Sequence, residues 1–209
     1  MIWFELEDKK NLWKVRKIHD VTFKDDEKER VVECIMYKDN VMLLVMRQRI
    51  IVMREDFVTL GTVDFKNQLG AGVNIVFCRP DHPTNKNGLL IGFFASDSAA
   101  KSPKFNLNAN GYEGSHPGNN TLVARFSFDK EKKQVKRSST PNDAVLLRSE
   151  LANSALEFTP KKILIATHSS KLLLFEDWNC VRVLSDPNPA NFTRINSAIS
   201  TLRMLPGFH

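Results

Sequence analysis

The stretch RSELANSALEFTPKKILIATHSSKLLLFE, residues 148–176, decides the fold class. Its Thr159-Pro160 pair interrupts an apolar segment, because proline fixes φ and has no backbone donor. The run ILIAT that follows is short and rich in branched residues, which is typical of a strand buried on both faces. HSSK is a tight polar turn and LLLFE a second strand, so the stretch predicts an antiparallel hairpin. Such a hairpin fits a sandwich, a barrel or one blade of a β-propeller.

Four further strands follow one another between residues 31 and 65. The segments VECIMY, VMLLVM, IIVMR and VTLGTVDF are separated by short polar turns. Strands of this length with Asp and Asn turns are typical of a meander. The methionines of this region are expected to fill the core rather than to bind a metal or a partner, because methionine packs irregular gaps well; they are Met36, Met42, Met46 and Met53.

A third patterned region begins with VNIVFCRP at Val73 and continues into LLIGFFASD. Residues 96–120 are rich in Gly, Asn, Ser and Pro, which predicts a loop inserted between strands. The following TLVARFSFD alternates, with Val123 on one face and Leu122 and Phe126 on the other. A four-strand pattern thus recurs within one domain, 1–209, in units of roughly 18–66, 67–140 and 141–186 with partial units at both ends. Propeller blades of about 40–45 residues give such a repeat.

Composition limits the possible classes of protein. With 209 residues, 42% hydrophobic and 26% charged, the chain can build a core and is not of disordered composition. No apolar run approaches the ~20 residues that span a bilayer, and the N-terminus lacks the layout of a signal peptide. Three widely separated cysteines, Cys34, Cys78 and Cys180, predict buried free thiols in a reducing compartment, with no metal site. A cytoplasmic or nuclear location follows.

The net charge of +6 permits attraction to acidic membranes or nucleic acid. One basic cluster, KEKKQVKR at residues 130–137, fits a solvated hairpin turn better than a phosphate-binding patch. The tryptophans lack the interleaved arginines of a nucleic-acid platform, so no nucleic-acid partner is expected. No nucleophile elbow, P-loop, zinc-protease or dinucleotide-binding motif occurs, and no histidine has a catalytic or metal spacing. The sequence therefore predicts a non-enzymatic protein without a cofactor.

Four segments, in order along the chain, are MIWFELEDKKNLWKVRKI, VECIMYKDNVMLLVMRQRIIVM, the stretch 148–176, and DPNPANFTRINSAI. Together they resemble the PROPPIN or WIPI family, whose members are seven-bladed β-propellers that bind phosphoinositides and act in autophagy. The resemblance implies an all-β, WD40-like propeller that is incomplete, with about four to five of the family's blades at about 42 residues each. It makes residues 191–205 a strand of the next blade, although the residues alone also fit a short amphipathic helix. A generic WD-type propeller is the alternative.

The resemblance also implies a lipid site, at Ser149, Thr167, Ser169, Ser170 and Lys171. The family's Arg-Arg pair is absent, because Ser185 and Asp186 occupy its place, and Leu147 replaces a family histidine. Each arginine would supply charge-assisted hydrogen bonds of roughly 1.5–3 kcal/mol, so weakened lipid binding is expected. His168 lies in the same turn and is expected to be a hydrogen-bonded turn residue rather than a phosphate ligand.

Two functions follow from these features. The first is a non-catalytic PROPPIN-like adaptor of autophagy, peripheral on phosphoinositide-marked autophagosome-precursor or endosomal membranes, with impaired lipid binding. The alternative is a WD-repeat scaffold that binds proteins and no lipid. The expected partners are a phosphoinositide-containing membrane, autophagy proteins, or a chain that completes the propeller. The short length predicts a fragment, an alternative gene product, or a reduced family member whose ring a partner completes.

Overall fold

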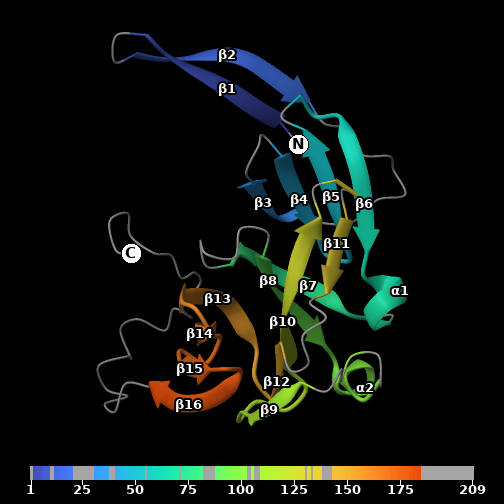
Figure 1. The fold of residues 1–209 in the computed structure, drawn as a ribbon, viewed down its shortest axis with the longest axis vertical. Helices are drawn as coiled ribbons and strands as arrows, with labels where there is room; N and C mark the ends of the chain where they lie inside the picture. The colour runs from blue at the N-terminus through green and yellow to red at the C-terminus, as the bar shows by residue number, and fades with distance from the viewer. Residues whose placement is uncertain are drawn as a thin grey trace. The chain divides into compact units, whose positions relative to one another are not determined.

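The computed structural model describes residues 2–9, 12–20, 31–37, 41–54, 56–70, 72–81, 88–102, 105, 109–129, 131–132, 134–137 and 143–184. The chain divides into two units, Met1–Arg30 and Val31–His209. The first contains an antiparallel hairpin of β1 (Ile2–Lys9) and β2 (Leu12–Asp20), with a register shift between Glu5 and Leu6 (Figure 1).

The first sheet of the second unit is a four-stranded antiparallel meander, which confirms the strands expected between residues 31 and 65. It consists of β3 (Val31–Tyr37), β4 (Val41–Met46), β5 (Arg49–Arg54) and β6 (Thr59–Asp64). Met42, Met46 and Met53 are buried, as expected. The expectation is wrong for Met36, which is 59% exposed. It lies one residue from the end of β3, which is at the edge of its sheet and has β4 as its one partner among the described strands.

The second sheet joins six strands, and a four-residue helix, α1 (Lys66–Leu69), precedes it. Its strands are β7 (Asn74–Pro80), β8 (Gly88–Ala95), β10 (Asn120–Asp129), β12 (Ala144–Arg148), β9 (Asn110–Glu113) and, on the far end of β10, β11 (Gln134–Arg137). The stretch 96–120, expected to be a loop, contains α2 (Asp97–Ala100) and β9, which pairs in parallel with β12. β12 falls within the third expected unit but pairs with β10 in the second sheet. The described residues of the basic cluster lie in the turn after β10 and in β11, and Asp129 Oδ1 accepts the Lys132 N–H at 3.0 Å.

The third sheet contains the stretch that opened the sequence analysis, and it confirms the predicted hairpin. Its four antiparallel strands are β13 (Ala152–Thr159), β14 (Lys162–Thr167), β15 (Leu172–Glu176) and β16 (Asn179–Leu184). β13 ends at Thr159, and the turn at Pro160 leads into β14. The HSSK turn joins β14 to β15.

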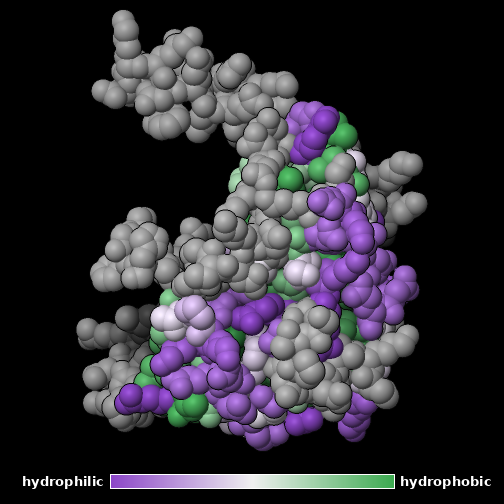
Figure 2. All heavy atoms as spheres, viewed as in Figure 1, coloured by the Kyte–Doolittle hydropathy of each residue, from purple (hydrophilic) through white to green (hydrophobic). Residues whose placement is uncertain are grey.

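The two faces of the second sheet belong to two hydrophobic cores. Alternate β10 residues, Leu122 and Phe126 among them, pack in the core shared with the first sheet, whereas Val123 packs in the core shared with the third. In the first core the rings of Phe65, Phe93 and Phe126 have centroids 5.1–5.7 Å apart, a separation at which aromatic pairs add to stability. Figure 2 shows hydrophilic residues over much of the described surface on one side, with smaller apolar areas between them.

The three sheets are arranged as successive propeller blades. The first strands of the sheets lie beside one another, since β3 contacts β7 and β7 contacts β13. Each sheet then continues through antiparallel neighbours, and the second sheet ends with the parallel pair of β12 and β9. Propellers repeat such sheets about a common axis. The chain is therefore an all-β protein with the fold of an incomplete WD40-like propeller, as predicted.

The three cysteines are free, as expected, but only Cys78 is buried, while Cys34 and Cys180 are half-buried. Burial raises the pKa of Cys34 to about 11, with a further contribution from the Glu33 carboxylate. Burial also raises the pKa values of Cys78 and Cys180. Neither short helix of the described ranges has the length and apolar character to cross a membrane.

Candidate functional site

Three of the five predicted lipid-binding residues meet at the β14–β15 turn. The Thr167 and Ser169 hydroxyl oxygens are 2.9 Å apart, and Thr167 Oγ1 accepts the Lys171 N–H at 3.2 Å. Ser170 contributes to the turn through its backbone, with φ of 61° and its N–H donated to Thr167 O at 3.2 Å. His168, exposed in this turn, donates its N–H to Leu151 O at 2.8 Å.

Glu150, which the sequence analysis did not select, occupies the centre of this cluster. Its side chain is 1% exposed. Ser169 Oγ donates to Glu150 Oε1 at 2.6 Å, and Lys171 Nζ donates to Glu150 Oε2 at 3.1 Å. A buried carboxylate requires such partners, because desolvation of an isolated charge is costly. The one cation among the predicted residues therefore pairs with a carboxylate of the same chain.

The surrounding backbone holds Glu150 in place. Buried Thr121 donates to Glu150 O at 3.2 Å and accepts the Ala152 N–H at 3.0 Å. Gly114 approaches so closely that a Cβ there would lie 2.6 Å from Glu150 Cβ, so no larger residue fits without a shift. Lys171 Nζ also donates to Ser115 Oγ at 3.3 Å, which links the segment after β9 to the β14–β15 turn.

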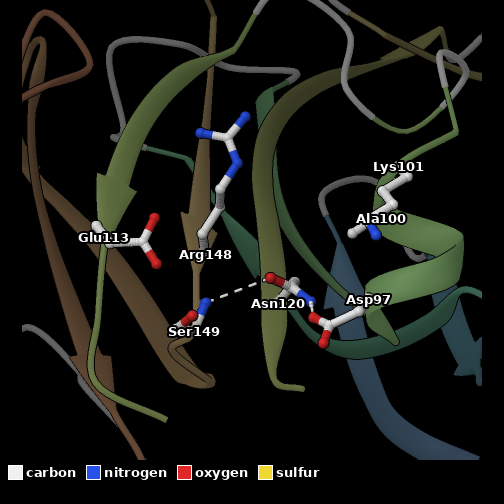
Figure 3. Close-up of a pocket in the computed structure, with 7 residues that line it drawn as sticks. All are labelled: Asp97, Ala100, Lys101, Glu113, Asn120, Arg148 and Ser149. Atoms are coloured by element: carbon white, nitrogen blue, oxygen red, sulfur yellow. Dashed lines mark hydrogen bonds between the residues drawn. The ribbon is translucent and has the colours of Figure 1, made fainter. Parts of the chain in front are cut away.

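Ser149, the remaining predicted residue, directly precedes Glu150 and lines a pocket of about 220 Å³ (Figure 3). Buried Asn120 fixes the pocket wall: its Oδ1 accepts the Ser149 N–H at 3.3 Å, and its Nδ2 donates to Asp97 Oδ1 at 2.8 Å. The pocket is bounded by α2 and the ends of three strands of the second sheet; its lining residues are Asp97, Ala100, Lys101, Glu113, Asn120, Arg148 and Ser149.

A second polar cluster, around Arg125 on β10, joins the second and third sheets. Arg125 Nη2 donates to Glu157 Oε1 on β13 at 2.7 Å, and Arg125 Nε lies 2.7 Å from Asp81 Oδ2. Asp143 Oδ1 lies 3.7 Å from Arg125 Nη1 and accepts the Trp178 indole N–H at 3.1 Å. Burial alone would lower the pKa of Arg125, but the three carboxylates raise it above its ordinary value. Arg125 therefore stays charged, and the cluster is an ionic contact between the second and third sheets.

The positions that depart from the family pattern are only partly described. Leu147, at the family histidine's position, is fully buried in the core between the second and third sheets. Ser185 and Asp186, at the position of the Arg-Arg pair, and residues 191–205 lie outside the described residues. No group of three or more His, Cys, Asp or Glu residues in the described part of the chain is arranged to hold a metal ion.

Comparisons with known proteins give only distant structural similarity. No protein-family model and no curated protein matches the sequence. The β-propeller domain of Myceliophteria thermophila Cps50 (Swd1) aligns with a TM-score of 0.49 and 13% identity, over 79% of this chain and 46% of that one. Kluyveromyces lactis Hsv2 aligns with a TM-score of 0.31 and 10% identity, over 93% of this chain and 63% of that one. A Bacteroides caccae protein of unknown function aligns with a TM-score of 0.45 and 9% identity, over 82% of this chain and 50% of that one.

This chain thus spans 46–63% of the length of these three structures. The arrangement of its own sheets, rather than these similarities, assigns it to the class of WD40-like β-propellers.

Proposed function

We propose that the chain is a non-catalytic β-propeller scaffold that acts by binding another protein. The observation that supports this is the pairing of Ser169 and Lys171 with buried Glu150. A phosphoinositide at the predicted site would have to take over a hydroxyl and an ammonium group that already bind a carboxylate. The phosphate would also lie beside that carboxylate, and like charges repel.

The outer strand of the third sheet offers a surface suited to a protein partner. Among the described strands β16 pairs only with β15, and its residues Val181, Val183 and Leu184 are exposed. Edge strands present unpaired backbone groups, and grouped exposed apolar side chains mark interaction surfaces. A chain that completes the propeller is one such partner. A cytoplasmic location is part of this proposal.

The second candidate is the PROPPIN-like adaptor, which would be peripheral on phosphoinositide-marked membranes and would bind autophagy proteins. The gathering of Thr167, Ser169 and Lys171 at one turn favours it. This function requires Lys171 to exchange Glu150 for a phosphate group.

Liposome co-sedimentation separates the two functions. Vesicles with and without phosphatidylinositol 3-phosphate or the 3,5-bisphosphate are mixed with the whole chain, and we expect no phosphoinositide-dependent binding. Saturable binding that disappears in Ser169→Ala plus Lys171→Ala while circular dichroism shows this variant to be folded, but persists in the exposed-surface control Lys161→Ala, would establish the lipid adaptor instead. For the scaffold function, a partner isolated from the source cells is purified and must re-form a stoichiometric complex with the chain during gel filtration.

A further inference from the structure

Arg148 and Glu113 occupy neighbouring positions in the second sheet but do not pair. They end β12 and β9, and the parallel register places them opposite each other, so their side chains share one face of the sheet. Both residues are exposed, and neither forms an ion pair with any residue that the structure describes. Arg148 therefore retains the hydrogen-bonding capacity of its guanidinium.

Gly111 makes room for this arrangement. A Cβ at Gly111 would lie 3.2 Å from Arg148 Nη1, so the guanidinium rests against a position of β9 that has no side chain. Figure 3 shows the guanidinium extending beyond the Glu113 carboxylate rather than meeting it. Glu113 and Arg148 both line the pocket of about 220 Å³.

The opposite wall of the pocket adds a second cation. Lys101, directly after α2, is exposed and forms no ion pair with the described residues. Asp97 on the same wall is held by the Asn120 amide at 2.8 Å. The lining therefore combines two cations with two carboxylates, and its formal charge is zero.

We propose that this pocket binds the carboxylate of an acidic side chain on a partner protein, with Arg148 as its bidentate donor and Lys101 as a second cation. This inference rests on the proposed scaffold function. The planar guanidinium matches a carboxylate, with two parallel N–H···O bonds. Glu113 and Asp97 oppose a group with two negative charges, which favours a carboxylate over a phosphate. The +6 charge of the chain attracts an acidic partner.

The test measures binding of a fluorescently labelled peptide of about ten residues, rich in Glu and capped at both ends, to the whole chain by fluorescence anisotropy. We expect saturable binding that Arg148→Gln weakens at least tenfold, because charge-assisted bidentate contacts are lost. Arg47→Gln, the matched control at an exposed arginine between β4 and β5, should change the affinity less than twofold. Glu113→Gln should tighten binding, whereas Glu131→Gln, the same charge change at the β10–β11 turn, should not.

Other outcomes overturn the proposal. Equal losses in Arg148→Gln and Arg47→Gln would indicate general charge attraction. Absence of saturable binding would also refute it. Arg148-dependent preference for the same peptide with phosphoserine, or for phosphoinositide vesicles, would refute the carboxylate as ligand. A purified partner that binds Arg148→Gln as tightly as the unchanged chain would refute this pocket but leave the scaffold function standing. Unchanged thermal unfolding of each variant excludes misfolding as the cause.

Discussion

Replacing Arg125 with methionine should strongly destabilise the fold. The substitution keeps an unbranched side chain but removes the cation between three carboxylates, whose side chains are 0% (Asp81), 4% (Glu157) and 13% (Asp143) exposed. Removing one partner of a buried ion pair costs about 3–5 kcal/mol, because the remaining charge stays desolvated. Loss of the contact between Arg125 and the Trp178 ring, 5.5 Å from its centroid, adds to this. The total free energy of unfolding of a folded domain is only about 5–15 kcal/mol.

Urea unfolding at pH 7, followed by circular dichroism, measures the free energy of unfolding of each variant. Arg54→Met is the matched control, because the Arg54 and Asp56 side chains are 56% and 50% exposed and water screens their attraction, so that its loss should change the free energy of unfolding little. Adding Glu157→Gln to Arg125→Met should recover about 1 kcal/mol or more relative to additive losses. If Arg125→Met cost no more than Arg54→Met, the cluster would not be an important inter-sheet contact.

Three further predictions concern single side chains. Lys171→Met should lower the free energy of unfolding by about 3 kcal/mol, because Glu150 remains buried without its ammonium partner, and adding Glu150→Gln should restore part of the loss in urea unfolding. Trp178→Phe removes the donor to Asp143 and should cost about 1–2 kcal/mol by the same assay; no change would mean that the bond contributes nothing. The Cys34 pKa is raised from 9.0 to about 11, so its stabilising contribution is complete below pH 9 and is lost as the pH rises toward about 11. The free energy of unfolding should therefore fall more steeply with rising pH in the unchanged chain than in Cys34→Ala. Parallel curves of the free energy of unfolding against pH would contradict the reasoning.

Most strands were predictable from local sequence, because their patterns depend on residues that are neighbours along the chain. VMLLVM and IIVMR are apolar, of strand length, and bounded by polar turns, and they became β4 and β5. Alternation in TLVARFSFD correctly divided Leu122 and Val123 between two cores. Burial of a strand residue near a sheet edge is less predictable, as exposed Met36 shows, since it depends on elements that local pattern does not specify.

The polar clusters were not predictable, because their members are distant in sequence. In the sequence, nothing distinguishes Glu150 from other charged residues between strands. Its partner Lys171 lies 21 residues later, and only the fold brings the two side chains together. Arg125 alternates correctly as a strand residue, but its carboxylates come from three separate segments. The four residues of β9 lie in a Gly- and Asn-rich stretch that has no strand pattern of its own. They pair with β12, a strand that starts more than thirty residues further along the chain.

The parallel placement of β9 also sets an order of events as the chain leaves the ribosome. β9 is synthesised before β10, yet its described strand partner is β12, which emerges only after β10 and β11. Residues 110–113 can therefore pair only after residues 144–148 have been synthesised, and the Arg148 pocket is completed later than the β7–β8 and β10–β11 hairpins.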